Sequence, residues 1–300
     1  CLSATRTGRR TRCPPARSAS GCDPLSPFTE EKIVTDKTDR KIIADFTVLT
    51  FCIAYLVSGI LIVLGQFGYR VYGWVDTLPQ FCANIPFAVY ILSPAIASYI
   101  ALKRSHKVAG LQQWLTAVFY AKNNGYPYLF VAAGLVLYFS EHAFLSGHIE
   151  TALPFYAFFL SLPGNLLIGG LEEAGWTYVM QPRLDIKLGY VLSCILSGMI
   201  WIAWHIPLFF IPGTNHEAGL INFWMFAVQC IALRFFFGAI CKVSGKSHVF
   251  LCVLFHTMFN AASSVFAPMT TTWTGTIAAN TVIVLVSIAT VAIFNKKQKN

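Results

Sequence analysis

The stretch PGNLLIGGLEEAGWTYVMQPRL, from Pro163 to Leu184, is apolar enough to lie in a membrane and yet contains two adjacent glutamates, Glu172 and Glu173. A charged side chain at the centre of a membrane costs about 3 kcal/mol on insertion scales, so it is rarely kept there without a partner or a function. Two neighbouring carboxylates add to this cost because their like charges repel each other. The glutamate pair therefore indicates a polar site inside a membrane domain.

The composition of the whole chain is typical of a membrane protein. Hydrophobic residues make up 56% of the chain and charged residues 12%, whereas soluble domains have about 25% charged residues. Because a helical span needs about 20 mostly apolar residues, the apolar runs predict an all-α, polytopic membrane protein of about eight transmembrane helices. The expected spans are Phe46–Gly65, Phe81–Leu102, Tyr128–Tyr138, Leu153–Gly170 continuing towards Leu184, Leu188–Ile211, Leu220–Ile240, Val249–Ala267 and Thr276–Phe294.

The distribution of basic residues supports this number of spans. Cytoplasmic loops of membrane proteins carry an excess of Lys and Arg, and here basic clusters alternate with loops that hold Arg70 at most, or acidic residues. The alternation predicts that both termini are cytoplasmic. Since the net charge of +9 follows from this bias, we expect the lipid bilayer as a partner and no nucleic acid. The clusters are Lys32, Lys37, Arg40 and Lys41; Lys103, Arg104, Lys107 and Lys122; Arg183 and Lys187; Lys242 and Lys246; and Lys296, Lys297 and Lys299.

The beginning of the chain differs from the rest. Residues 1–44 are predicted to be a disordered or basic cytoplasmic segment, and residues 45–295 to form the eight-helix membrane domain. Residues 1–20 contain five arginines, no acidic residue and no apolar core, which is not the pattern of a secretory signal. Because it is rich in Arg and Ser, this stretch fits an organellar transit segment; a fragment boundary or a mis-assigned start is the alternative.

Strongly polar side chains occur on three expected helices of the C-terminal half. Besides the glutamate pair, His205 lies in WIAWHIPLFF, and His256 lies four residues before Asn260 in LCVLFHTMFNAAS, on one helical face. Counted from the expected helix starts at 1.5 Å per residue, these side chains reach similar depths. We therefore predict that they line one polar cavity. The remaining histidines are expected to be solvated, in or beside loops: His106, His142, His148, His216 and His248.

This set of groups fits the hydrolysis of a peptide bond. A carboxylate and an imidazole can together deprotonate a water molecule, and a second imidazole and a carboxamide can donate hydrogen bonds to the oxyanion that develops. In this interpretation no cofactor is required. Two histidines and a glutamate can instead hold a zinc ion, and its ligands would be Glu172, His205 and His256. The pattern leaves the choice between these two mechanisms open.

At these residues the chain resembles the CPBP intramembrane proteases, which include type II CAAX prenyl endopeptidases and bacteriocin-processing or immunity proteins. The motifs of that family are Glu-Glu-x-x-x-Arg, Phe-x-x-x-His and His-x-x-x-Asn, on separate helices. They correspond here to EEAGWT at 172–177, WIAWH at 201–205 and HTMFN at 256–260. The order and spacing of the motifs make the resemblance specific, and it covers residues 153–267.

The resemblance implies a metal-dependent or glutamate-type CAAX protease and a role for each residue. Glu172 and His205 would activate the water molecule, and Glu173 would orient the site. His256 and Asn260 would bind the oxyanion. The substrate would be a membrane-embedded or prenylated peptide. A bacterial plasma membrane fits the resemblance best, and a eukaryotic organelle stays open because of the Arg-rich N-terminus.

Two positions depart from the motifs. Trp201 stands in place of Phe, and Thr177 in place of the motif's Arg. A cation one turn from Glu173 would keep that carboxylate ionised, but Thr supplies no charge. Arg183 is expected either to substitute for it in part or to extend to the membrane interface. The loss of the arginine leaves two alternatives to an active protease. One is a non-catalytic family member acting in bacteriocin immunity or membrane interaction, and the other is a small proton-linked transporter.

Overall fold

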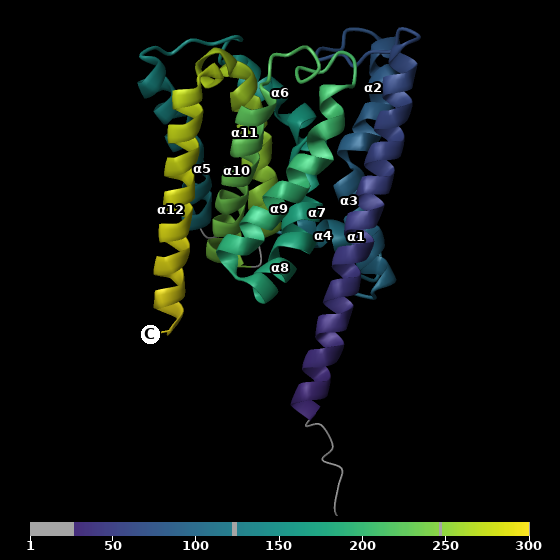
Figure 1. Ribbon diagram of the computed structural model, residues 1–300, viewed down its shortest axis with the longest axis vertical. Helices are drawn as coiled ribbons and strands as arrows, with labels where there is room; N and C mark the ends of the chain where they lie inside the picture. Colours follow the sequence, from purple (N-terminus) through teal and green to yellow (C-terminus); the bar gives the residue numbers. More distant parts are fainter. Residues whose placement is uncertain (1–26, 122–124, 246–247, 300) are drawn as a thin grey trace, which may run out of the picture. The chain divides into compact units, whose positions relative to one another are not determined.

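The computed structural model describes residues 27–121, 125–245 and 248–299 (Figure 1). The chain forms two units, Cys1–Lys37 and Thr38–Asn300, and the packing given below is that of the second unit. The described residues form helices and no strand. The helices are α1 Pro27–Gly65, α2 Leu78–Ile91, α3 Ser93–Arg104, α4 Leu111–Val118, α5 Gly125–Ser146, α6 Tyr156–Leu167, η1 Gly170–Glu172, α7 Glu173–Gly175, η2 Trp176–Met180, α8 Gln181–Leu188, α9 Tyr190–His205, η3 Ile206–Phe209, α10 Phe223–Ser244, α11 His248–Val265, η5 Ala267–Thr271 and α12 Trp273–Lys299.

The prediction of an all-α, polytopic membrane protein is confirmed. Six helical stretches in the described part of the chain are long and apolar enough to cross a membrane, and the pair α2 and α3, bent by 49°, makes up to seven. The expected span from Leu153 to Leu184 is not one continuous helix in the structure, and the number of eight spans stays a prediction. The six stretches are Lys37–Gly65, Gly125–Ser146, Tyr190–Phe209, Phe223–Ser244, His248–Val265 and Trp273–Lys297.

The segment that contains the glutamate pair is broken by glycine. Helix α6 ends at Leu167, and Gly169 follows with φ of +135°, a backbone conformation that is strained for any residue with a Cβ. The chain then forms the 3₁₀ turn η1, the short α7 and the π-helical turn η2; π-helical turns are frequent at functional sites. Irregular backbone inside a membrane protein is tolerated where protein surrounds it. The break places Glu173 at the start of a new helical segment.

Neighbouring helices enclose this broken segment. Helix α11 packs against α6, η1 and α7, helix α3 packs against α7, and α10 packs against both α9 and α12. Figure 1 shows α7 within the bundle, next to α3. The core around it is aromatic, because Trp176 contacts Phe46 and Trp204 edge to face, with ring centroids 5.4 and 5.9 Å apart. The glutamate pair is therefore surrounded by protein.

The predicted N-terminal segment is described only in part. Residues 1–26 lie outside the described residues. Residues 27–44, predicted to be part of a disordered or basic segment, belong to helix α1. From Thr38 onward α1 contributes to the core of the second unit, where Ile42 and Phe46 are fully buried.

Gly175→Ala is expected to destabilise the protein. A Cβ at this position would lie 2.7 Å from the backbone oxygen of Pro94, and overpacking of this kind costs about 1–3 kcal/mol. The unfolding temperature in detergent measures the effect. Gly59→Ala is the matched control, because a Cβ there would have nothing within 4 Å. Equal unfolding temperatures for the two variants would contradict the close packing of α7 on α3.

Candidate active site

Glu173 is bound through both of its carboxylate oxygens. Nη1 of Arg234, from α10, donates to Oε2 of Glu173 at 3.0 Å. Nδ1 of His256, from α11, lies 3.2 Å from Oε1. The side chains of Glu173 and Arg234 are 0% exposed. A buried charge is tolerated only when it is paired and hydrogen-bonded, and this arrangement meets that condition for Glu173.

Glu172 is bound by a different helix. Its Oε2 accepts a hydrogen bond from Nε1 of Trp201, on α9, at 3.0 Å. The two glutamates diverge because successive residues of a helix point about 100° apart. Consequently Glu172 contacts α9, while Glu173 contacts α10 and α11.

Trp201 is the common neighbour of the polar groups. Its ring centroid lies 5.1 Å from that of His205 and 5.6 Å from that of His256, in edge-to-face contacts. The guanidinium carbon of Arg234 lies 5.7 Å from the same ring centroid. His205 Nδ1 is 2.8 Å from the backbone oxygen of Trp201. Because a carbonyl oxygen only accepts, this bond places the proton on Nδ1 and leaves Nε2 of a neutral His205 with its lone pair.

His256 and Asn260 lie one turn apart on α11, against the glycine break. A Cβ on Gly169 would overlap Nδ2 of Asn260, and a Cβ on Gly170 would overlap the hydroxyl of Thr257. The two glycines therefore allow α11 to approach the backbone that carries the glutamates. Asn260 is half-buried, whereas His256 is buried with 5% of its surface exposed.

Glu172, His205 and His256 are the ligands predicted for a zinc ion. Among residues 27–121, 125–245 and 248–299, no group of three or more His, Cys, Asp and Glu side chains is arranged to hold a metal ion. The hydrogen bonds described for the two histidines involve Nδ1 only: His205 contacts the backbone of Trp201, and His256 contacts Glu173. Nε2 of each ring is not part of these bonds, so the choice between a zinc ion and direct activation of water stays a prediction.

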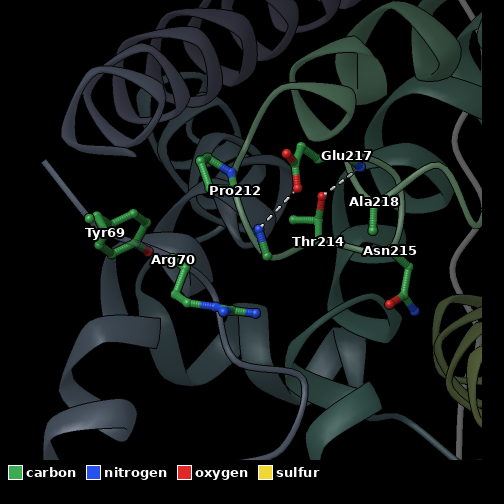
Figure 2. A pocket seen from close by; sticks show the side chains of 9 residues that line it. Tyr69, Arg70, Pro212, Thr214, Asn215, Glu217 and Ala218 are labelled. Carbon is green, nitrogen blue, oxygen red and sulfur yellow. Dashed lines mark hydrogen bonds between the residues drawn. The ribbon is translucent and has the colours of Figure 1, made fainter. Parts of the chain in front are cut away.

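A surface cavity of about 510 Å³ lies away from these residues (Figure 2). It is lined by the loop after α1 and the loop before α10. Figure 2 shows its carboxylate, Glu217, accepting from the backbone N–H of Gly213, at 3.3 Å, so this side chain stabilises its own loop. No predicted site residue lines the cavity, which is formed by Gly68, Tyr69, Arg70, Pro212, Gly213, Thr214, Asn215, Glu217 and Ala218.

A comparison with protein families identifies the segment that holds the site. Residues 153–262 match the model described as type II CAAX prenyl endopeptidase Rce1-like. This segment is an Rce1-like region. The match confirms the resemblance predicted from the three motifs, which lie within residues 172–260. A comparison with curated proteins gave no match.

Arg234 is the residue of the Rce1-like region that sequence reasoning missed. It is the one charged residue between Phe223 and Cys241, inside an apolar helix. A cation in such a position is as costly as the glutamate pair, so the same criterion would have singled it out. The sequence alone would still not have paired it with Glu173, because the partners are 61 residues apart.

Arg183 has a different role from the one predicted for it. Its Nε donates to Asp39 at 3.1 Å, and its Nη1 donates to the backbone oxygens of Tyr178 and Val179 at 3.3 and 3.0 Å. It therefore links the start of α8 to α1. The expectation that Arg183 supports the glutamates was wrong, because its donors are engaged elsewhere.

Of the histidines expected to be solvated, His142 is buried and His216 is half-buried. His142 lies inside α5, with 1% of its surface exposed. His216 packs on Phe226, which in turn packs on His205, with centroid distances of 5.2 and 4.9 Å. Burial lowers the pKa of His216 to about 4, so this loop residue is neutral at neutral pH. The expectation failed because nearness to a helix end in the sequence does not determine tertiary packing.

Glu173→Ala is expected to cost about 3–5 kcal/mol of unfolding free energy, because it leaves Arg234 as an unpaired buried charge. Glu172→Ala is the matched control. It removes the acceptor of one neutral donor, which costs about 1–3 kcal/mol. Unfolding in detergent measures both. A Glu172→Ala variant as unstable as Glu173→Ala would contradict the pairing of the buried Arg234 charge with Glu173 alone.

Proposed function

We propose that the Rce1-like region is an intramembrane endopeptidase of the CAAX-protease type. It hydrolyses a peptide bond in a membrane-associated substrate such as a prenylated peptide. The observation that carries this proposal is that the two glutamates have different partners. Glu173 is neutralised by Arg234 and contacts His256, whereas Glu172 has the Trp201 indole as its neighbour. One carboxylate is thus structural, and the other is available for chemistry.

In the proposed reaction, Glu172 and His205 bind and activate the water molecule. The water oxygen attacks the scissile carbonyl carbon while its proton passes to Glu172. His205, whose Nδ1 is held by the backbone of Trp201, accepts a hydrogen bond from the water through Nε2. When the C–N bond breaks, Glu172 returns the proton to the leaving amine, so the carboxylate is regenerated.

His256 and Asn260 stabilise the oxyanion of the tetrahedral intermediate. Nδ1–H of His256 donates to Glu173, and a protonated ring then has Nε2–H free to donate to the oxyanion. With His256 protonated, two carboxylates face two cations, since Arg234 is the other, and the buried cluster has no net formal charge. The Asn260 carboxamide supplies the second donor. These steps use side chains of the chain itself and require no cofactor.

The position of the protein in the cell follows the same proposal. The apolar helices and the protease family indicate an integral membrane protein. We propose a bacterial plasma membrane with both termini cytoplasmic, supported by the basic residues at alternate loops. The substrate would reach the glutamates laterally from the lipid or from the cytoplasmic side.

The proposal is tested by cleavage of a quenched fluorescent prenylated peptide by the purified protein in detergent. We expect Glu172→Ala to lower kcat by about 1,000-fold or more, because general base catalysis and the nucleophile depend on this carboxylate. The variant's unfolding temperature shows that it is folded. Glu217→Ala, in the distant surface cavity, is the control with unchanged kcat.

Two further outcomes separate the alternatives. Wild-type protein that cleaves neither prenylated nor unprenylated peptide would contradict the proposal and favour a non-catalytic family member. Loss of cleavage with a chelator, restored by zinc, would contradict the cofactor-free mechanism while leaving the peptidase function in place.

A further inference from the structure

The position of the missing motif arginine is occupied by a residue that cannot replace it. Thr177 is fully buried, and its hydroxyl donates to the backbone oxygen of Glu173 at 2.6 Å. This hydroxyl therefore turns back onto its own helix and brings no charge to the carboxylate. Arg183, the nearest arginine in the sequence, is bound to Asp39. The charge that supports Glu173 has to come from another helix.

Arg234 brings that charge to the face on which residue 177 lies. Residues 173, 177 and 181 are spaced by four, and the bond from the Thr177 hydroxyl to the Glu173 backbone oxygen places Thr177 one turn after Glu173. Arg234 joins the two outer members of this series: Nη1 donates to Glu173 at 3.0 Å, and Nη2 donates to Gln181 at 3.4 Å. The guanidinium thus bridges across the turn that contains Thr177.

The neighbours of Arg234 hold its side chain in this orientation. Gln181 Oε1 accepts from Ser197 at 2.8 Å, and Gln181 Nε2 donates to Ser193 at 3.1 Å, so the acceptor is itself fixed by α9. A Cβ on Gly198 would lie 3.1 Å from the backbone of Ile231. The glycine therefore lets α9 and α10 come close. The rings of Trp201 and Phe237 lie 5.7 and 5.0 Å from the guanidinium carbon, where cation–π attraction adds to the ion pair.

We propose that Arg234 replaces, from α10, the arginine that the Glu-Glu-x-x-x-Arg motif carries at position 177. It is a positioning residue: its ion pair fixes the carboxylate of Glu173, and Glu173 in turn orients His256. In this proposal, Thr at position 177 does not mean that the site has lost its activity, because α10 supplies the positive charge instead. The consequence for activity rests on the proposed function, but the consequence for stability does not.

The test moves the arginine from α10 to position 177 by mutation. It compares Arg234→Met, Thr177→Arg and the double variant. Arg234→Met is expected to lower kcat by about 100-fold with KM within about threefold, and to lower the unfolding temperature by about 5 °C or more. Thr177→Arg alone adds a second cation beside Glu173 and also lowers the unfolding temperature. In the double variant the motif arrangement returns, so both kcat and the unfolding temperature rise above those of Arg234→Met.

Arg183→Met is the matched control, because it removes a partly buried arginine outside the site and leaves kcat unchanged. Arg234→Lys, which keeps the charge, is expected to retain more activity than Arg234→Met. If Arg234→Met does not fold, recovery of a folded protein in the double variant still supports the proposal that Arg234 replaces the motif arginine. A double variant no better than Arg234→Met in either measurement overturns it. If wild type has no peptidase activity, the proposed function fails, and the unfolding temperatures alone decide the role of Arg234.

Discussion

The ion pair between Glu173 and Arg234 is the interaction on which the rest of the site depends. Both side chains are 0% exposed, so the charges depend on each other and on neighbouring side chains, and not on water. A broken pair of this kind costs far more than a surface pair, because the remaining charge stays buried. The ion pair therefore fixes the position of α7 relative to α10. His256 of α11 contacts the same carboxylate.

The backbone break gives the neighbouring glutamate a separate environment. Gly169 and Gly170 let α11 approach η1 closely, and the irregular turns that follow direct Glu172 to Trp201 of α9. Trp201 also contacts both site histidines. An indole at this position supplies a hydrogen-bond donor that the motif's Phe lacks. The two departures from the family motifs, at positions 177 and 201, thus both concern how the glutamates are held.

Composition and polar residues in apolar runs were enough to predict a helical membrane protein and a site built from three helices. The continuity of the span around Glu172 could not be predicted, because a glycine with positive φ has no signature beyond Gly itself. The partner of Glu173 could not be found either, since pairing between residues 173 and 234 depends on how α7 and α10 pack. Arg234 itself was visible as an isolated cation in an apolar run. The burial of histidines such as His142 was not predicted either, because it also depends on how the helices pack.

A double-mutant cycle between Glu173 and Arg234 tests this account most directly. Unfolding free energies of the wild type, Glu173→Ala, Arg234→Ala and the double variant give the coupling between the two side chains. We expect a coupling of about 2 kcal/mol or more, because each single variant leaves one buried charge without its partner. A coupling near zero would mean that the two charges do not stabilise each other, and it would contradict the site as described.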